Sequence, residues 1–280
     1  MSPGAGRPDR VRRDMAAAEA LELALRQGGA AHEAARQAIL SRDEPEDVHA
    51  ARVALRRMRS ILRGFGDMVA SKTGARLDDL LAERCRALAA LRDADVQAEA
   101  ATGASRAEAA ARAQRLRAEA RAMLADPQDH PPLPGLIAAT TGDRARLCKG
   151  NRRRRLAAAP VALIAARGLQ TAWSELLSFG PQPEALPPEE RHQFRKRAKD
   201  LRYIAEFFAP LFDGRQPRAM LKTIKALQDA LGTLNDLHVM AADAALPDDA
   251  AAREAKARDK ARKLWKRLRA SPVWWLDVAA

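Results

Sequence analysis

The sequence predicts an all-α protein made of two tandem, pseudo-symmetric four-helix bundles that pack as one body. Apolar residues recur at helical spacing along most of the chain, and no run of β-branched or aromatic residues alternates with the period of two typical of a half-buried strand. Two sequence patterns also recur at one constant offset, which indicates a tandem duplication. The helical periodicity predicts the fold class, and the repeat predicts the two bundles.

The composition limits the classes of partner. The chain has 280 residues, of which 47% are hydrophobic, enough to bury a substantial core. Lysine and arginine number 49 against 36 acidic residues, which gives a formal net charge of +13. Such an excess of positive charge favours polyanionic partners: a nucleic acid, an anionic membrane surface or a phosphate polymer.

The cysteines and the apolar segments indicate a cytoplasmic protein. Cys85 and Cys148 are too few and too far apart to form a disulfide scaffold or a zinc site with paired ligands, so we expect free thiols. The N-terminus is basic but lacks the apolar core of a signal peptide, and no run is long enough to span a membrane.

The chain begins with residues 1–13, whose content of Gly, Pro and Arg is typical of a disordered basic tail. A first helix is expected from Asp14. Gly28 and Gly29 are expected to break or bend this helix, because glycine weakens helical structure. The second helix is expected to begin near Pro45, since proline is favoured in the first turn.

The second helix has one cationic side and one apolar side. At about 100° per residue, five of its basic side chains fall within an arc of about 80°. These residues, called the first stripe below, are His49, Arg52, Arg56, Arg59 and Arg63. The opposite side carries Leu55, Met58, Ile61, Leu62 and Phe65. No acidic residue lies between Asp47 and Asp67, so the cationic side is uninterrupted.

Two more helices complete the predicted first half, which covers residues 14–127. They are expected over about 72–99 and about 105–124, where leucine and alanine recur at helical spacing. The prolines that follow cannot continue a helix, so residues 127–135 are predicted to connect the two halves.

The second half, residues 143–270, follows the same plan. Its expected helices are about 143–179 with a break at Pro160, one introduced by Pro187 and Pro188, about 217–245, and about 248–270. Residues 14–270 together form the predicted domain, and residues 271–280 are expected to be a C-terminal tail.

The helix introduced by Pro187 and Pro188 repeats the first stripe. Its cationic residues, called the second stripe below, are His192, Arg195, Lys199 and Arg202, with Lys196 at the rim of the arc. The offset between the leading histidines is 192 − 49 = 143 residues.

A second pair of motifs has the same offset. The pattern L-R-D-A-D-V begins at Leu91 and L-N-D-L-H-V begins at Leu234, so the offset is again 234 − 91 = 143. The correspondence fails at Arg63, whose matched residue is Glu206, and this limits the second stripe at its C-terminal end.

The residue types of the stripes suit phosphate. Arginine binds phosphate oxygens bidentately, lysine acts as a point charge, and histidine donates a hydrogen bond from a ring nitrogen. A phosphate polymer presents no base edges, so charge and hydrogen bonds to its oxygens must supply the affinity. The alternative is that both stripes are solvated helix faces, which is the usual role of a charge run.

The sequence lacks the common catalytic motifs. No GxxxxGK[ST] loop, HExxH, nucleophile elbow or CxxC is present, so we predict no enzyme activity, no catalytic residues, no cofactor and no metal site. The matched acids Asp93 and Asp236 lack partners at metal-ligand spacing. We expect them to position an arginine or to cap the local chain.

Taken together, these motifs resemble a known family. The patterns V-H-x-x-R-V-x-L-R-R-x-R, H-x-F-R-K-R-x-K-x-L-R-Y, L-R-D-x-D-V and L-x-D-x-L-G-x-L-N-D are similar to those of the conserved histidine α-helical domain (CHAD) over about residues 14–270. The resemblance implies two pseudo-symmetric four-helix bundles with a basic central surface that binds inorganic polyphosphate, often at polyphosphate granules in bacteria. It also implies that Lys222 and Lys225 reach the surface of the second stripe.

Two alternatives remain. General binding of polyanions, including the DNA or RNA backbone, is expected on charge alone, but only 4% of the residues are aromatic, and single-strand binders usually stack bases on aromatic rings. Attachment to a membrane surface is suggested by Trp265, Trp274 and Trp275 beside basic residues, although closing a helical core is the commoner use of such residues. Protein partners cannot be predicted.

Overall fold

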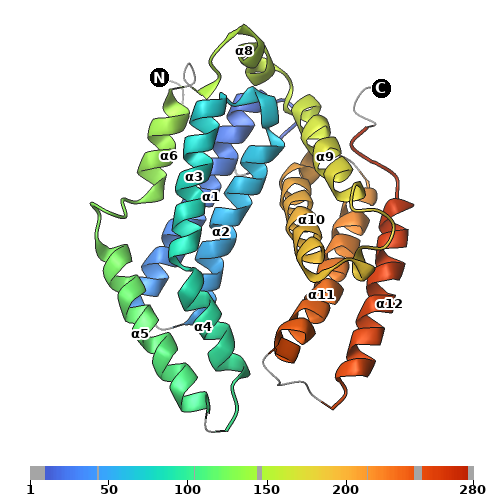
Figure 1. The fold of residues 1–280 in the computed structure, drawn as a ribbon. Helices are drawn as coiled ribbons and strands as arrows, with labels where there is room; N and C mark the ends of the chain where they lie inside the picture. The colour runs from blue at the N-terminus through green and yellow to red at the C-terminus, as the bar shows by residue number, and fades with distance from the viewer. Residues whose placement is uncertain are drawn as a thin grey trace. The chain divides into compact units, whose positions relative to one another are not determined.

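The protein consists of α-helices joined by loops and short 3-10 turns (Figure 1). The computed structural model describes residues 10–42, 44–103, 105–143, 147–212, 214–242 and 248–276. No strand occurs in these ranges, so the all-α prediction is confirmed.

The chain forms two compact units. Among the described residues, unit 1 comprises 16–159, and unit 2 comprises 10–15 and 160–276. The division lies later than the connection expected at 127–135. The reason is that helix α6 (Leu133–Gly142), which the sequence did not predict, packs on the first helix and belongs to unit 1.

Unit 1 is arranged around its first two helices, α1 and α2, which pack along each other. Its α-helices are α1 (Ala17–Ser41), α2 (Pro45–Gly64), α3 (Ser71–Ala87), α4 (Ala89–Ala100), α5 (Ser105–Ala125), α6 (Leu133–Gly142) and α8 (Asn151–Ala158). Helix α3 packs on α2, α4 packs on α5, and α6 and α8 both pack on α1. The single helix expected over 72–99 is divided at Leu88, whose φ of −95° and ψ of 6° leave the α-helical region.

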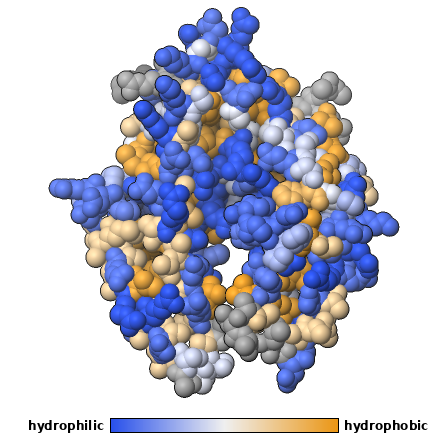
Figure 2. All heavy atoms as spheres, viewed as in Figure 1, coloured by the Kyte–Doolittle hydropathy of each residue, from blue (hydrophilic) through white to orange (hydrophobic). Residues whose placement is uncertain are grey.

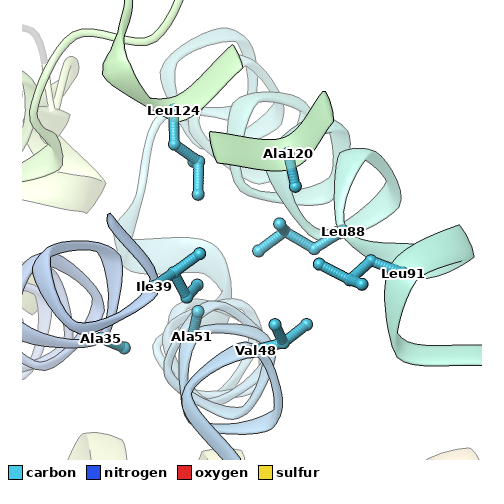
Figure 3. Packing of buried hydrophobic residues seen from close by; sticks show 8 residues of the cluster. All are labelled: Ala35, Ile39, Val48, Ala51, Leu88, Leu91, Ala120 and Leu124. Atoms are coloured by element: carbon cyan, nitrogen blue, oxygen red, sulfur yellow. The ribbon is translucent and has the colours of Figure 1, made fainter. Parts of the chain in front are cut away.

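A hydrophobic cluster holds the N-terminal part of α2 in unit 1. Figure 3 shows side chains from α1, α2, α5 and the junction of α3 and α4 meeting in one place. The cluster consists of Ala35, Ile39, Val48, Ala51, Leu88, Leu91, Ala120 and Leu124. Because Val48 and Ala51 are fully buried here, α2 cannot rotate about its axis without exposing apolar surface. The opposite, cationic side of α2 is thereby kept out of the core.

The two glycines of α1 have a packing role. The helix runs without interruption through Gly28 and Gly29, so the expected break or bend is wrong. A Cβ at Gly28 would overlap Cγ of the buried Met58 on α2, and a Cβ at Gly29 would lie 2.6 Å from Cδ1 of Ile137 on α6. Glycine is therefore needed for the close approach of neighbouring helices.

Replacing Gly28 should destabilise unit 1. Gly28→Ala is expected to lower the free energy of unfolding by about 1 kcal/mol or more, because overpacking at Met58 outweighs the gain in helix propensity. Chemical denaturation followed by circular dichroism measures this change. The matched control is Gly135→Ala in α6, where an added Cβ meets nothing within 4 Å. Equal stability of the two variants would contradict the packing role.

In its described residues, unit 2 contains four α-helices. They are α9 (Val161–Leu177), α10 (Pro188–Phe208), α11 (Gln216–Ala242) and α12 (Ala250–Arg269), with 3-10 turns η2 (Pro183–Ala185) and η3 (Ala209–Leu211) between them. Helix α10 packs on α9 and α11, and α11 packs on α12. Pro160 precedes α9, and Pro188 begins α10, because proline fits the start of a helix but not its interior.

An aromatic cluster forms the core of unit 2. The ring of Trp265 lies 5.8 Å from that of Trp173 and 5.2 Å from that of Phe194, and the rings of Trp274 and Trp275 lie 4.9 Å apart. Trp265, Trp274 and Trp275 are at most 3% exposed. Their indole N–H groups donate to Gly180 O, Met220 Sδ and Gln170 Oε1. These tryptophans close a core, so they provide no membrane anchor.

Both predicted tails are therefore shorter than expected. Trp274 and Trp275 lie in the core of unit 2, so residues 271–276 are not a free tail. At the other end, Val11 is 3% exposed, and Arg13 Nε donates to Leu211 O over 2.6 Å. Residues 1–9 and 277–280, the remainder of the predicted tails, lie outside the described residues.

Candidate functional site

The first stripe lies on the side of α2 that faces away from the core. The apolar residues on the opposite side are all buried, with exposed fractions between 0% and 7%. None of the five stripe residues is buried: His49 and Arg63 are exposed, and Arg52, Arg56 and Arg59 are partly exposed. The amphipathic pattern therefore predicts the orientation of α2 correctly.

Two arginines of the first stripe are held by groups on α3. Arg52 Nη1 donates a hydrogen bond to the carbonyl oxygen of Cys85. Arg59 pairs bidentately with the carboxylate of Asp78, with both nitrogen–oxygen distances 2.8 Å. Arg52 keeps its full charge beside a neutral acceptor, whereas the charge of Arg59 is compensated.

The second stripe is placed in the same way on α10. The apolar residues Phe194, Leu201, Ile204 and Phe208 are at most 1% exposed. His192 and Lys196 are exposed, and Arg195, Lys199 and Arg202 are partly exposed. Figure 2 shows that hydrophilic residues cover much of the visible surface of each unit.

The two stripes also share one kind of hydrogen bond, made by a matched pair of arginines. Arg195, the residue matched to Arg52, also donates to a backbone carbonyl of the next helix, with Nη1 2.9 Å from Leu231 O on α11. Its Nη2 lies 3.9 Å from the position that a Cβ would occupy at Gly232. The guanidinium group of Arg195 thus lies beside Gly232 on this side of α11. Both units thus fix an arginine at the same place in the stripe.

The same side of α11 carries two of the predicted lysines. At about 100° per residue, Lys222, Lys225 and Gly232 fall within an arc of about 80°. Both lysines are exposed. Since Arg195 reaches α11 at Gly232, the two lysines share this side of α11 with an arginine of the second stripe. Asp229 and Asp236 lie within the same arc and reduce its net charge.

The second stripe ends in a compensated arginine. Arg202 Nη1 lies 3.5 Å from the carboxylate of Glu206, one turn further along α10. The guanidinium carbon of Arg202 also lies 4.8 Å from the ring centroid of Tyr203, a cation–π distance. Arg202 and its counterpart Arg59 are therefore both paired with a carboxylate, although the acids come from different positions.

His192 is neutral near pH 7 in the free protein. Partial burial lowers the pKa of His192 below its ordinary value of 6.5, and the charges of Lys196, Arg195 and Lys199 lower it further. Glu189 opposes these effects. A bound anion would add negative charge close to this ring and would raise its pKa.

The structure places each stripe within its own unit. The five residues of the first stripe follow α2, while the second stripe and the two lysines of α11 lie in unit 2. That the two stripes form one surface stays a prediction.

The carboxylates that hold stripe arginines differ from those that the sequence suggested. Within the described ranges, neither Asp93 nor Asp236 makes an ion pair, and both are exposed. In the first motif it is Asp95 that is buried, 2.6 Å from Arg117 of α5, where the pair supports the packing of α4 on α5. Asp78 was missed because only the packing of α3 on α2 brings it to Arg59.

Other kinds of site find no support in the described part of the chain. It contains no group of three or more His, Cys, Asp and Glu side chains that could hold a metal ion. Cys85 and Cys148 are free thiols. No helix in these ranges is both long enough and apolar enough to cross a membrane.

Comparisons with known proteins agree with this fold. A family model described as the CHAD domain matches residues 19–245. The crystal structure of the CHAD domain from the plant Ricinus communis aligns with a TM-score of 0.69 and 23% identity, over 97% of this chain and 94% of that chain. PptA from Streptomyces chartreusis aligns with a TM-score of 0.53 and 16% identity, over 91% of this chain and 97% of that chain. No curated protein matches the sequence.

Proposed function

Because the chain belongs to the CHAD domain family, we propose that it binds inorganic polyphosphate without catalysing its turnover, through the first and second stripes. The observation that carries this proposal is a repeat: matched positions of α2 and α10 present the same kinds of cation on unburied sides. The ligand residues are the five of the first stripe, the four of the second stripe, and Lys196, Lys222 and Lys225.

The fixed arginines suit a polymer of phosphate. Arg52 and Arg195 each use one nitrogen to bind a backbone carbonyl, and a guanidinium group carries further N–H groups that can donate to phosphate oxygens. Holding the guanidinium group in advance reduces the side-chain entropy that binding would otherwise cost. Because neutral carbonyls do the holding, the positive charge remains available to the ligand.

The paired arginines are expected to contribute less. Asp78 and Glu206 compensate the charges of Arg59 and Arg202 in the free protein. A phosphate group must compete with these carboxylates or accept only the remaining N–H groups. We assign the largest contributions to Arg52, Arg56, Arg195 and Lys199, which occupy matched central positions of the two stripes.

The family resemblance also suggests where the protein acts. We propose that it works in the cytoplasm, in association with polyphosphate granules. The structural relatives share at most 23% identity with the chain and support the fold alone.

Nucleic-acid binding is the second candidate, supported by the net charge of +13. The aromatic residues argue against a dedicated single-strand site. Tyr203, the aromatic residue beside Arg202, is 5% exposed, and all four tryptophans are at most 4% exposed. These buried rings are not available to stack on bases, which favours contacts to the phosphate backbone.

Removing the four strongest cations should abolish most of the affinity. A variant with Arg52, Arg56, Arg195 and Lys199 changed to alanine is expected to bind long-chain polyphosphate at least about 100-fold more weakly, since each charge-assisted hydrogen bond contributes about 1.5–3 kcal/mol. Binding is measured in about 150 mM salt, where weak surface electrostatics are screened. Circular dichroism checks that the variant is folded.

The control variant removes the same number of positive charges from positions outside the stripes. Arg106 and Arg115 on α5 and Lys256 and Lys260 on α12 are exposed and lie outside the stripes, two in each unit. Their combined change to alanine should weaken binding by less than about fivefold, the loss expected from a lower net charge alone. Equal losses in the two variants would show that net charge, and not the stripes, determines binding.

Binding should strengthen as the pH falls, in part through His192. Its pKa lies below 6.5 in the free protein and should rise beside phosphate, so binding takes up a proton. The affinity then increases as the pH drops through the pKa of the complex and levels off below the pKa of the free protein. Titrations between about pH 8 and pH 5.5 at fixed salt measure this dependence.

His192→Gln should remove that part of the pH dependence, because glutamine keeps a hydrogen-bond donor but cannot gain a charge. The control is His238→Gln, which changes an exposed histidine on another side of α11. If His192→Gln follows the same pH profile as the unchanged protein, charging of this histidine plays no part in binding.

A further inference from the structure

A pocket of unit 2 is unused by the stripes. It has a volume of about 570 Å³, within the range of small-molecule sites, and lies where residues 10–13 meet the segment that joins α10 to α11. Its lining residues are Arg10, Val11, Arg12, Arg13, Glu206, Ala209, Pro210, Phe212, Gly214, Pro217 and Arg218. Asp213, next to the lining residue Phe212, lies outside the described residues.

The N-terminal wall of the pocket is fixed to the rest of unit 2. Arg13 Nε donates to Leu211 O over 2.6 Å, and the backbone N–H of Val161 donates to Met15 O over 3.1 Å. Val11, two residues before Arg13, is 3% exposed. The segment that carries the arginines is thus held in place in the free protein.

The cationic part of the lining can accept an anion. Arg12 is paired bidentately with Asp14, at 3.0 Å and 2.9 Å. In the part of the chain that the structure describes, no hydrogen bond or ion pair engages the guanidinium groups of Arg10 and Arg218, and both residues are exposed. These two groups are suited to bidentate binding of phosphate.

The remaining lining differs from that of a site for a bare anion. Ala209, Pro210, Phe212 and Pro217 supply apolar surface, and the ring of Phe212 is held against Trp274, with their centroids 4.8 Å apart. Glu206 adds a carboxylate, which repels a phosphate group but accepts hydrogen bonds from hydroxyl or amino groups. A matching ligand carries phosphate at one end, and an apolar ring with hydrogen-bond donors at the other.

Those requirements describe a nucleotide. We propose that this pocket binds a nucleoside phosphate, with its phosphates on Arg10 and Arg218, its ring on the apolar wall, and a hydroxyl or amino group donating to Glu206. Glu206 stands where the first stripe has the cation Arg63. The pocket shares Glu206 with the end of the second stripe, because this carboxylate also lies 3.5 Å from Arg202, but its proposed phosphate ligands Arg10 and Arg218 lie outside both stripes.

Isothermal titration calorimetry of the full chain tests this assignment. In the variant with Arg52, Arg56, Arg195 and Lys199 changed to alanine, which weakens binding of short polyphosphates to the stripes, ATP in the absence of divalent cations should bind at least about tenfold more tightly than inorganic triphosphate, because only ATP can contact the apolar wall and Glu206. Changing Arg10 and Arg218 to alanine should weaken ATP binding at least about tenfold. The control Arg106→Ala with Arg115→Ala removes the same charge from α5 and should leave ATP binding unchanged.

Two outcomes would overturn the proposal. If triphosphate binds the variant without the four stripe cations as tightly as ATP does, or if neither ligand binds it, the apolar wall does not form a nucleotide site. If changing Arg195 and Lys199 to alanine abolishes ATP binding while the Arg10 and Arg218 variant retains it, ATP binds the second stripe as a simple polyanion. If the unchanged protein binds ATP but does not bind polyphosphate, that result would contradict only the proposed function.

Discussion

Burial of one side of α2 and of α10 is the constraint on which the rest of the site depends. Leu55 and Met58 on α2, and Phe194 and Phe208 on α10, are fully buried, and each such side chain stabilises the fold by about 1.5–3 kcal/mol. Rotating either helix to hide its cations would lose several of these contributions at once and would also bury unpaired charge. The cationic sides are therefore kept out of the core by the packing of the opposite sides.

The contacts made by the stripe arginines then distinguish two roles. Arg52 and Arg195 are each oriented by a backbone carbonyl, a neutral acceptor that does not compensate their charge, which suits binding to an anion. Arg59 and Arg202 are paired with carboxylates and have less net attraction to offer. Within each unit the attraction for a polyanion should thus be strongest at the middle of the stripe. The sequence alone suggests that each stripe is a row of equivalent cations. The structure shows that the arginines of a stripe have different partners.

Sequence periodicity predicted the features that depend on neighbours in the chain. The helices α2 and α10, their apolar sides and the 143-residue repeat belong to this class. Gly28 was misjudged because its role is set by Met58 on another helix. Helix α6 was missed because its one proline, Pro134, lies in its first turn, where proline is tolerated. Likewise, the partners of Arg52 and Arg59 depend on the packing of α3 on α2, and no pattern within either helix predicts which residues meet.

The most direct test of the account is competition binding of long-chain polyphosphate against single-stranded and duplex DNA, at matched phosphate concentration in about 150 mM salt. Regularly spaced cations, with Tyr203 beside them buried, should prefer the polymer that presents only phosphate. The account predicts that polyphosphate displaces both DNA forms at a concentration at least about tenfold lower than the DNA concentration needed to displace polyphosphate. Equal affinity for the three polymers would contradict a dedicated polyphosphate site and would indicate a general polyanion-binding protein.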